Sequence, residues 1–298
     1  MKMLFFINPR AGSSGIRAQL LDVLKLFCSA GYEVRVHTTS GPQEITRIIA
    51  AEGQNYDMIV SSGGDGTLNE TVAGLLQLEK PPVLGYIPAG TINDVAFSLH
   101  LSMDPVEAAK TVLYGTAMDL DAGTMNGRGF AYVSAFGAFT DVAYVTSQDA
   151  KKALGKLAYL LQGVKSLAEI KPIHARIIAD GVEEEDDFLL GLVCNTKSVG
   201  GIRPSSMKNS FISLNDGLSE VPFVRNIRKL SELNETAAQV LKMDFTNRKR
   251  FLSFQTNRVQ IEFDRDVAWT LDGEDGGSCR AAEILNHHRA LRIMVPRV

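Results

Sequence analysis

The feature that most constrains the fold is a regular alternation of short apolar runs and helix-like segments over roughly the first 115 residues. The apolar runs fit strands, and the segments between them carry apolar residues at helical spacing. Strands are predicted at residues 3–8, 32–36, 57–62 and 83–87, and helices at 17–30, 43–51, 67–78 and 91–99. Such alternation is typical of βαβ units, in which helices cover both faces of a mainly parallel sheet.

The pattern changes near residue 118, where paired strand-like runs replace the alternation. Asn126-Gly127 and Asp180-Gly181 each separate two such runs, which is a hairpin signal. Further strands are predicted at 173–179, 188–194, 210–214, 218–224, 251–256, 258–263 and 267–271, and helices at 152–168 and 225–242. We therefore expect an α/β plus all-β chain. Its first domain spans 1–118, an antiparallel β-sandwich-like domain spans 119–289, and 290–298 form a strand for which a return to the first domain is one alternative.

Composition excludes several classes of protein. The chain has 298 residues, of which 45% are hydrophobic and 22% charged, as expected of a folded soluble protein. Its net charge of -3 gives no general attraction for nucleic acid. Three widely spaced cysteines (Cys28, Cys194, Cys279) predict neither a disulfide framework nor a zinc ribbon, so a reducing, cytoplasmic location is expected. We also expect no transmembrane segment, and any membrane contact to be peripheral. A basic segment at 151–165 leaves docking on anionic lipid open.

Glycine-containing loops follow three of the predicted strands. They are NPRAGSSG at 8–15, GGDGT at 63–67 and PAGTIND at 88–94, and the last two lead into predicted helices. Glycine allows close backbone approach, and the free N–H groups of a helix N-terminus attract phosphate. The hydroxyls of Thr67 and Thr91 can bond a phosphate oxygen or cap a helix. Because the carboxyl ends of parallel strands meet at one edge of a sheet, the three loops together predict a phosphate site.

Asp65 lies inside the second of these loops. A bare carboxylate beside phosphates repels them, so Asp65 is expected to hold a cation, bind a ribose or move a proton. The alternative is that it caps the helix that begins near Thr67, and Asp94 has the same two alternatives for its own helix. The chain contains neither GxxxxGK[ST] nor GxGxxG, which argues against a P-loop or a dinucleotide-binding fingerprint.

SSGGDGTLNETVAGL followed by LGYIPAGTINDVA resembles the bacterial diacylglycerol-kinase-like lipid kinase family, whose catalytic domain also occurs in eukaryotic diacylglycerol, sphingosine and ceramide kinases. GGDGT alone is shared with NAD kinases and phosphofructokinases. Its combination with PAGTxND about 20 residues later is far more specific. The resemblance extends to the opening INPRAG, to His37–Thr39, to Asn215–Leu218 as a DG-L element and to Leu271–Glu274 as a late DGE.

The resemblance implies ATP-dependent phosphorylation of a lipid hydroxyl with Mg²⁺, with the nucleotide on the first domain and the lipid on the second. Glu274 would be the general base, and Asp65 and Asp94 would join the magnesium and water network. A second, structural Mg²⁺ would be held by the Asp216 carboxylate and the backbone carbonyls of Ser213 and Leu218. The residues expected to contact ATP are Asn8, Pro9, Arg10, Ala11, Gly12, Thr39, Gly63, Gly64, Asp65, Gly66, Thr67, Leu68, Asn69 and Thr91.

The residues themselves also allow simpler interpretations of the late acidic positions. Residues 272–277 can be a solvated hairpin tip, because acidic glycine turns often are. Asp275 departs from the family pattern, and its charge is expected to raise the pKa of Glu274. Asp216 can belong to a plain Asn-Asp-Gly turn, because a hard cation needs more oxygens than one carboxylate supplies.

The hypothesis is therefore a lipid kinase that acts on diacylglycerol or a related lipid at a membrane surface. Two alternatives stay open: an NAD-kinase-like enzyme that phosphorylates a ribose hydroxyl, and a non-catalytic regulator that binds nucleotide or lipid. A nucleic-acid partner is not expected. A homodimer is kept open as the commonest assembly of soluble homo-oligomers. The acceptor lipid cannot be named from the sequence.

Overall fold

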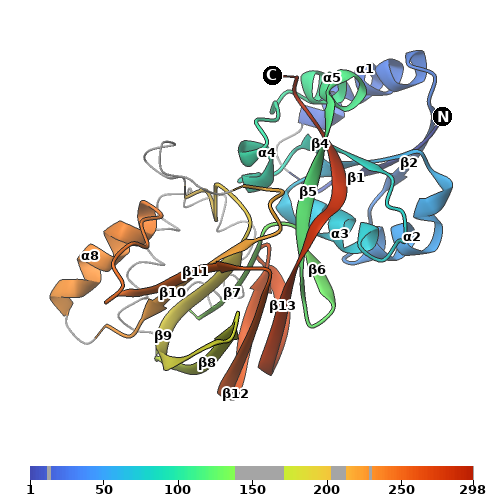
Figure 1. Ribbon diagram of the computed structural model, residues 1–298. Coiled ribbons are helices and arrows are strands. Elements are labelled where there is room, and N and C mark those ends of the chain that lie inside the picture. The colour runs from blue at the N-terminus through green and yellow to red at the C-terminus, as the bar shows by residue number, and fades with distance from the viewer. Residues whose placement is uncertain (12–14, 138–170, 203–212, 228–229, 298) are drawn as a thin grey trace.

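The computed structural model describes residues 1–11, 15–137, 171–202, 213–227 and 230–297 (Figure 1). The helix expected at 152–168, the basic segment at 151–165 and Gly12 lie outside the described residues. So does most of the strand expected at 210–214, whose last two positions are not in a strand.

The first part of the chain forms a parallel sheet with helices on both sides (Figure 1). Its strands pair in parallel in the order β2-β1-β3-β4. These strands are β1 (Lys2–Ile7), β2 (Glu33–Thr38), β3 (Met58–Gly63) and β4 (Val83–Pro88). The segments between and after them form α1 (Gly15–Ser29), α2 (Glu44–Glu52), η1 (Gly53–Asn55), α3 (Asp65–Leu75), α4 (Asp94–Ser98) and α5 (Pro105–Tyr114).

Strand β1 explains why this sheet is covered on both faces. Its side chains alternate between two cores, as the period of a strand requires. Met3 and Phe5 lie with α1 and α5, whereas Leu4 and Phe6 lie with α2 and α3. A strand buried on both faces is a continuous apolar run, and that run is the first strand predicted from the sequence.

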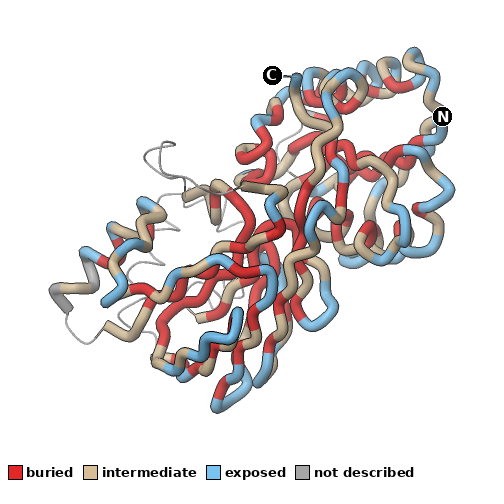
Figure 2. Tube along the Cα trace, viewed as in Figure 1, coloured by how far each residue is buried: buried red, intermediate tan, exposed pale blue. Residues whose placement is uncertain are grey.

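The second part is a set of antiparallel strands with one described helix, α8 (Leu230–Leu241). Its core is aromatic: Phe136 contacts both Phe223 and Trp269, at ring-centroid distances of 5.3 and 5.0 Å. Figure 2 shows the central strands as buried and the outer helix surfaces as exposed. The strands are β5 (Thr116–Met125), β6 (Arg128–Phe130), β7 (Val133–Gly137), β8 (Ile173–Ala179), β9 (Val182–Cys194), β10 (Ser219–Arg225), β11 (Phe251–Thr256), β12 (Arg258–Leu271) and β13 (Glu274–Val295).

Strand β13 belongs to both parts of the molecule. It begins at Glu274 as the hairpin partner of β12, and its later residues pair with β5. Ile293 near its end pairs in parallel with Leu84 of β4. The two sheets are therefore one continuous hydrogen-bonded system, with β13 between β12 and β4 (Figure 1).

Among the described residues of the second part, three tight turns join consecutive strands into hairpins. Each has two central residues with positive φ, which is the geometry of a type I′ turn. Asn126-Gly127 and Asp180-Gly181 confirm the two predicted hairpins. The third is Asp272-Gly273, with φ of 52° and 83°, and it brings Glu274 opposite Leu271.

Helices α4 and α5 differ from the expectation, and α8 begins later than the helix expected at 225–242, because Arg225 still belongs to β10. No helix was predicted over α5, although Asp104 caps it by accepting from the N–H groups of Val106 and Glu107. Helix α4 begins at Asp94 and not at Thr91, because Asn93 has a φ of 56° that no right-handed helix accommodates. The loop before α4 is therefore longer than expected and lies entirely at the sheet edge.

Candidate active site

The three glycine loops meet at the carboxyl edge of the parallel sheet. The Asn8 side-chain N–H donates to Thr67 Oγ1 at 3.0 Å, which joins the first loop to the second. The Ala89 N–H donates to the Gly63 carbonyl at 2.8 Å, which joins the second to the third. A Cβ on Gly90 would lie 2.4 Å from the Cα of Gly64, so the contact between these loops requires glycine. The predicted convergence of the loops is thus present in the structure.

Asp65 holds the third loop by its backbone. Its Oδ2 accepts from the Asn93 N–H at 2.8 Å and its Oδ1 from the Asp94 N–H at 2.9 Å. Asp65 lies in the first turn of α3, but it caps α4. The alternative that it caps its own helix is therefore wrong, because the helix that it caps is the next one. Burial and, second to it, the nearby Asp94 charge together raise the pKa of the Asp65 carboxyl to about 7.

Asp94 ties α4 to the second part of the molecule. Its side chain is 1% exposed. Its Oδ1 accepts from the Ser198 hydroxyl at 2.5 Å and from the Gly201 N–H at 3.0 Å, and its Oδ2 accepts from the Tyr132 hydroxyl at 3.4 Å. The carboxylate thus bonds groups from the second part and does not cap its own helix.

Glu274 lies against the loop that contains Asp65. A Cβ on Gly66 would be 2.6 Å from Glu274 Oε1, so the carboxyl rests on the backbone of this glycine. Glu274 itself is exposed. Its position at the start of β13 therefore brings a carboxylate from the far end of the sequence to the glycine-loop edge.

Asp272 was not singled out as a functional residue, yet it has the most hydrogen bonds of the acidic residues around the site. It is 4% exposed and accepts from the N–H groups of Ala131, Tyr132 and Val133 at 2.6, 2.9 and 2.9 Å. The Asn69 side-chain N–H of α3 donates to it at 2.7 Å. Burial raises the pKa of Asp272 to about 6, against the lowering effect of these bonds. An acidic glycine turn carries no sequence signal for such burial, so the interpretation as a fully solvated tip is wrong at this residue.

The other residues expected to contact nucleotide fall into two groups. Pro9, Arg10, Ala11, Thr39 and Thr91 lie on loops at the same edge, where the Thr39 N–H donates to the Ile7 carbonyl. Leu68 is buried, and the Asn69 side-chain N–H donates to Asp272. Both side chains therefore make contacts within the protein.

The expected structural metal position is a well-formed turn. Asp216 is exposed, and its Oδ1 accepts from the Leu218 N–H at 3.1 Å, as in a plain Asx turn. The Ser213 hydroxyl donates to Asn215 Oδ1 at 3.1 Å. Within the described residues, no group of three or more His, Cys, Asp or Glu is arranged to hold a metal ion.

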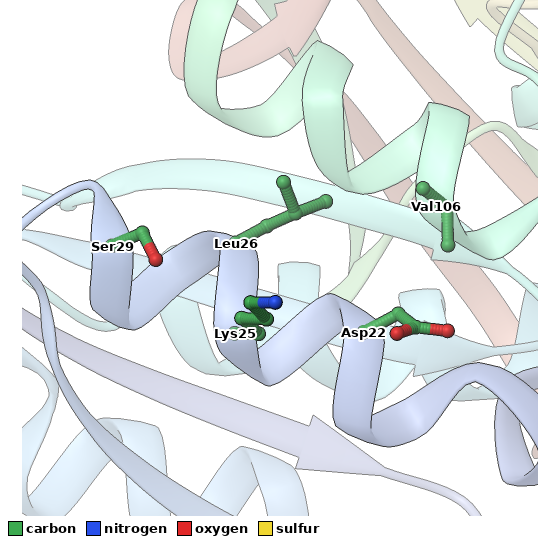
Figure 3. A pocket seen from close by; sticks show the side chains of 5 residues that line it. All are labelled: Asp22, Lys25, Leu26, Ser29 and Val106. Atoms are coloured by element: carbon green, nitrogen blue, oxygen red, sulfur yellow. The ribbon is translucent and has the colours of Figure 1, made fainter.

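A surface groove elsewhere contains none of the predicted residues. It lies between α1 and α5, and Leu26 and Val106 point into it (Figure 3). Its lining residues are Asp22, Lys25, Leu26, Ser29 and Val106. None of them comes from the glycine loops.

Both parts of the chain match known family models. Residues 2–125 match the diacylglycerol kinase catalytic domain, and residues 135–295 match the YegS C-terminal NAD kinase beta sandwich-like domain. In the part of the chain that the structure describes, no helix is long and apolar enough to cross a membrane.

Curated relatives cover almost the whole chain. A diacylglycerol kinase from Bacillus subtilis is 33% identical over 97% of this chain and 95% of its own length. A diacylglycerol kinase from Staphylococcus aureus is 30% identical over 97% of this chain and 90% of its own length. The fold resembles two solved structures of putative diacylglycerol kinases from Bacillus anthracis. They have TM-scores of 0.82 and 0.80 at 24% and 23% identity, cover 99% of this chain, and are themselves covered over 95% and 97%.

Glycine loops at the edge of an α/β sheet, faced by a carboxylate from an attached β-sandwich, suit a phosphotransferase. The chain belongs to the diacylglycerol kinase family, and it is a lipid kinase. The resemblance that the sequence motifs indicated is confirmed.

Proposed function

We propose that the protein transfers the γ-phosphate of ATP to the hydroxyl of diacylglycerol or a related lipid. The observation that carries the proposal is the contact between the Glu274 carboxyl and Gly66. It brings a proton acceptor to the loop expected to bind phosphate. The names of the relatives add support for diacylglycerol as the acceptor.

The proposed reaction needs positioning and one proton acceptor. The Glu274 carboxylate takes the proton of the lipid hydroxyl. The oxygen of that hydroxyl forms a bond to the γ-phosphorus of ATP. The bond between that phosphorus and the β,γ-bridging oxygen breaks, and ADP leaves. Backbone N–H groups of the glycine loops, where Cβ atoms are absent, bind the phosphate oxygens.

We propose that Asp65 and Asp94 face a Mg²⁺ that accompanies the nucleotide. Carboxylate oxygens are hard donors and suit this ion. Each oxygen of Asp65 accepts one N–H and keeps a second lone pair for a water or a cation. When bound, Mg²⁺ would supply neutralisation of phosphate charge.

We keep a second, structural Mg²⁺ at Asp216 and the backbone carbonyls of Ser213 and Leu218. Glu220 Oε2 is buried without a hydrogen-bond partner among the described residues, and burial together with the nearby Asp216 charge raises the pKa of Glu220 to about 7, so a second carboxyl group near Asp216 supports the proposal. Equilibrium dialysis with Mg²⁺ tests it. Replacement of Asp216 by Asn should remove one bound ion, and an unchanged stoichiometry would contradict the assignment.

The decisive experiment incubates the protein with labelled ATP, Mg²⁺ and mixed micelles of single lipids. Diacylglycerol, phosphatidylglycerol, undecaprenol and a sphingoid base are compared with NAD, and Glu274→Gln is the negative control. We expect label in a lipid product. Label in NAD alone would favour the NAD-kinase-like alternative, and ATP binding without transfer to any acceptor would favour the regulator.

A lipid hydroxyl lies at a membrane surface, so we also propose peripheral membrane contact. Co-sedimentation with diacylglycerol-containing vesicles tests it, and a protein that stays in the supernatant would contradict it. A cytoplasmic location and a homodimer stay predictions from the sequence.

A further inference from the structure

Hydrogen bonds to Asp272 fix the turn of the β12–β13 hairpin. Four N–H groups converge on the Asp272 carboxylate, three from the backbone of 131–133 and one from the Asn69 side chain. Each carboxylate oxygen accepts two of them. A buried carboxylate bonded on both oxygens has a single orientation, so the backbone of Asp272 is fixed as well.

Glu274 follows Asp272 so closely in the sequence that its backbone has little conformational freedom. Only Gly273 separates them, in a two-residue turn whose ends, Leu271 and Glu274, are paired across the hairpin. Leu271 is 2% exposed and belongs to the aromatic core of the second part. The main chain of Glu274 therefore has a defined position, although its side chain is exposed.

Helix α3 meets this hairpin twice. Gly66 touches the Glu274 carboxyl, and Asn69 donates to Asp272. Positions three apart lie on one face of a helix, so the two contacts come from the same side of α3. A rotation or shift of the hairpin against α3 would therefore disturb both contacts together.

We propose that Asp272 is a positioning residue that fixes the Glu274 carboxyl on Gly66 in the geometry needed to accept the substrate proton. This inference rests on the proposed function of Glu274 as general base. Asp272 itself touches no reacting atom and acts through the turn. A misplacement of about 1 Å is expected to cost about 10²-fold in rate, which is why a residue of this kind affects turnover.

The first test is steady-state kinetics of Asp272→Asn. The amide keeps the shape but turns one acceptor oxygen into a donor that faces N–H groups. We expect kcat to fall about tenfold or more while KM for ATP stays within about twofold, because the glycine loops are unchanged. The matched control is Asp180→Asn, the same substitution in the same turn type, where Asp180 is exposed and far from the loops in sequence. Its kcat should equal that of the wild type.

The second test is a double-mutant cycle with Glu274→Gln. If Asp272 acts through Glu274, then Asp272→Asn should lower the residual rate of the Glu274→Gln enzyme by less than about twofold. Equal fold losses in both backgrounds, or an unchanged kcat in the wild-type background, would overturn the inference and leave the proposed function intact. Full activity of Glu274→Gln alone would instead overturn the proposed function, and the inference with it.

If Asp272→Asn does not fold, Asn69→Ala takes its place in the cycle. This variant removes one of the four bonds and leaves the hairpin sequence unchanged. It should lower kcat in the wild-type background and have almost no effect beside Glu274→Gln. An equal loss in both backgrounds would again contradict the role of Asp272.

Discussion

The edge of the parallel sheet and the β12–β13 hairpin contribute to the site in opposite ways. The sheet edge contributes backbone, since its loops pack against each other through Gly64 and Gly90, where a side chain would not fit. The hairpin offers a side chain, Glu274, on a turn that a buried carboxylate holds in place. Because of this difference, we expect substitutions at the sheet edge to change the affinity for ATP and substitutions in the hairpin to change kcat.

The largest effect is expected on the hairpin side, from Glu274→Gln. Loss of a general base costs about 10²- to 10⁴-fold in kcat. The affinity for ATP should stay near that of the wild type, because the glycine loops are untouched. Steady-state kinetics with calorimetric ATP titration measure both quantities. A variant with wild-type kcat would contradict the assignment, and one that loses ATP affinity would remove the contrast between the two regions.

The opposite result is expected on the sheet edge, from Gly90→Ala. The new Cβ would meet the Gly64 backbone at 2.4 Å, and backbone cannot rotate away as a side chain can. Overpacking of this kind costs about 1–3 kcal/mol, so ATP affinity and the free energy of unfolding should both fall. Gly41→Ala is the control, because nothing lies within 4 Å of its Cβ position. Equal ATP affinity in both variants would contradict the close contact.

A smaller effect is expected where the two regions are joined, from Ser198→Ala. The substitution leaves the buried Asp94 carboxylate without its shortest hydrogen bond. The carboxylate keeps the Gly201 N–H and the Tyr132 hydroxyl, and loss of one hydrogen bond to a charged group costs about 1.5–3 kcal/mol, which urea denaturation measures. A free energy of unfolding equal to that of the wild type would indicate that Asp94 finds another donor.

The last effect concerns pH. The pKa of Asp65 is about 7 in the folded protein and about 3.8 in an unfolded chain. A raised pKa gives stability that is full below the unfolded value and is lost as pH rises through the folded one. Without nucleotide, the Tm of the wild type should therefore fall more between pH 5 and pH 7.5 than that of Asp65→Asn. Parallel Tm curves would contradict the raised pKa.

Much of this arrangement was predictable because short stretches of the sequence carry the signals for it. Alternating and continuous apolar runs gave the strands, and glycine-rich loops after three of them gave the sheet edge. Helix α5 was missed although Asp104-Pro105 is a capping signal, which shows that a short amphipathic segment is easily passed over.

The partners of the acidic residues could not be predicted, for a physical reason. Asp65 caps α4 and Asp272 collects the N–H groups of 131–133, and both depend on where distant backbone lies after folding. A carboxylate in a glycine turn has the same sequence pattern whether solvent or backbone satisfies it. Only the three-dimensional position of the donors distinguishes the two.

Strand β13 limits how the two parts of the molecule can move relative to each other. A strand that is hydrogen-bonded into both sheets resists bending along most of its length. Its ladder with β5 shifts register between His287 and Leu291, and Arg289 there has a φ of 52°. Any relative movement of the two parts should therefore be concentrated as a hinge at this irregularity, which lies well along β13 from Glu274.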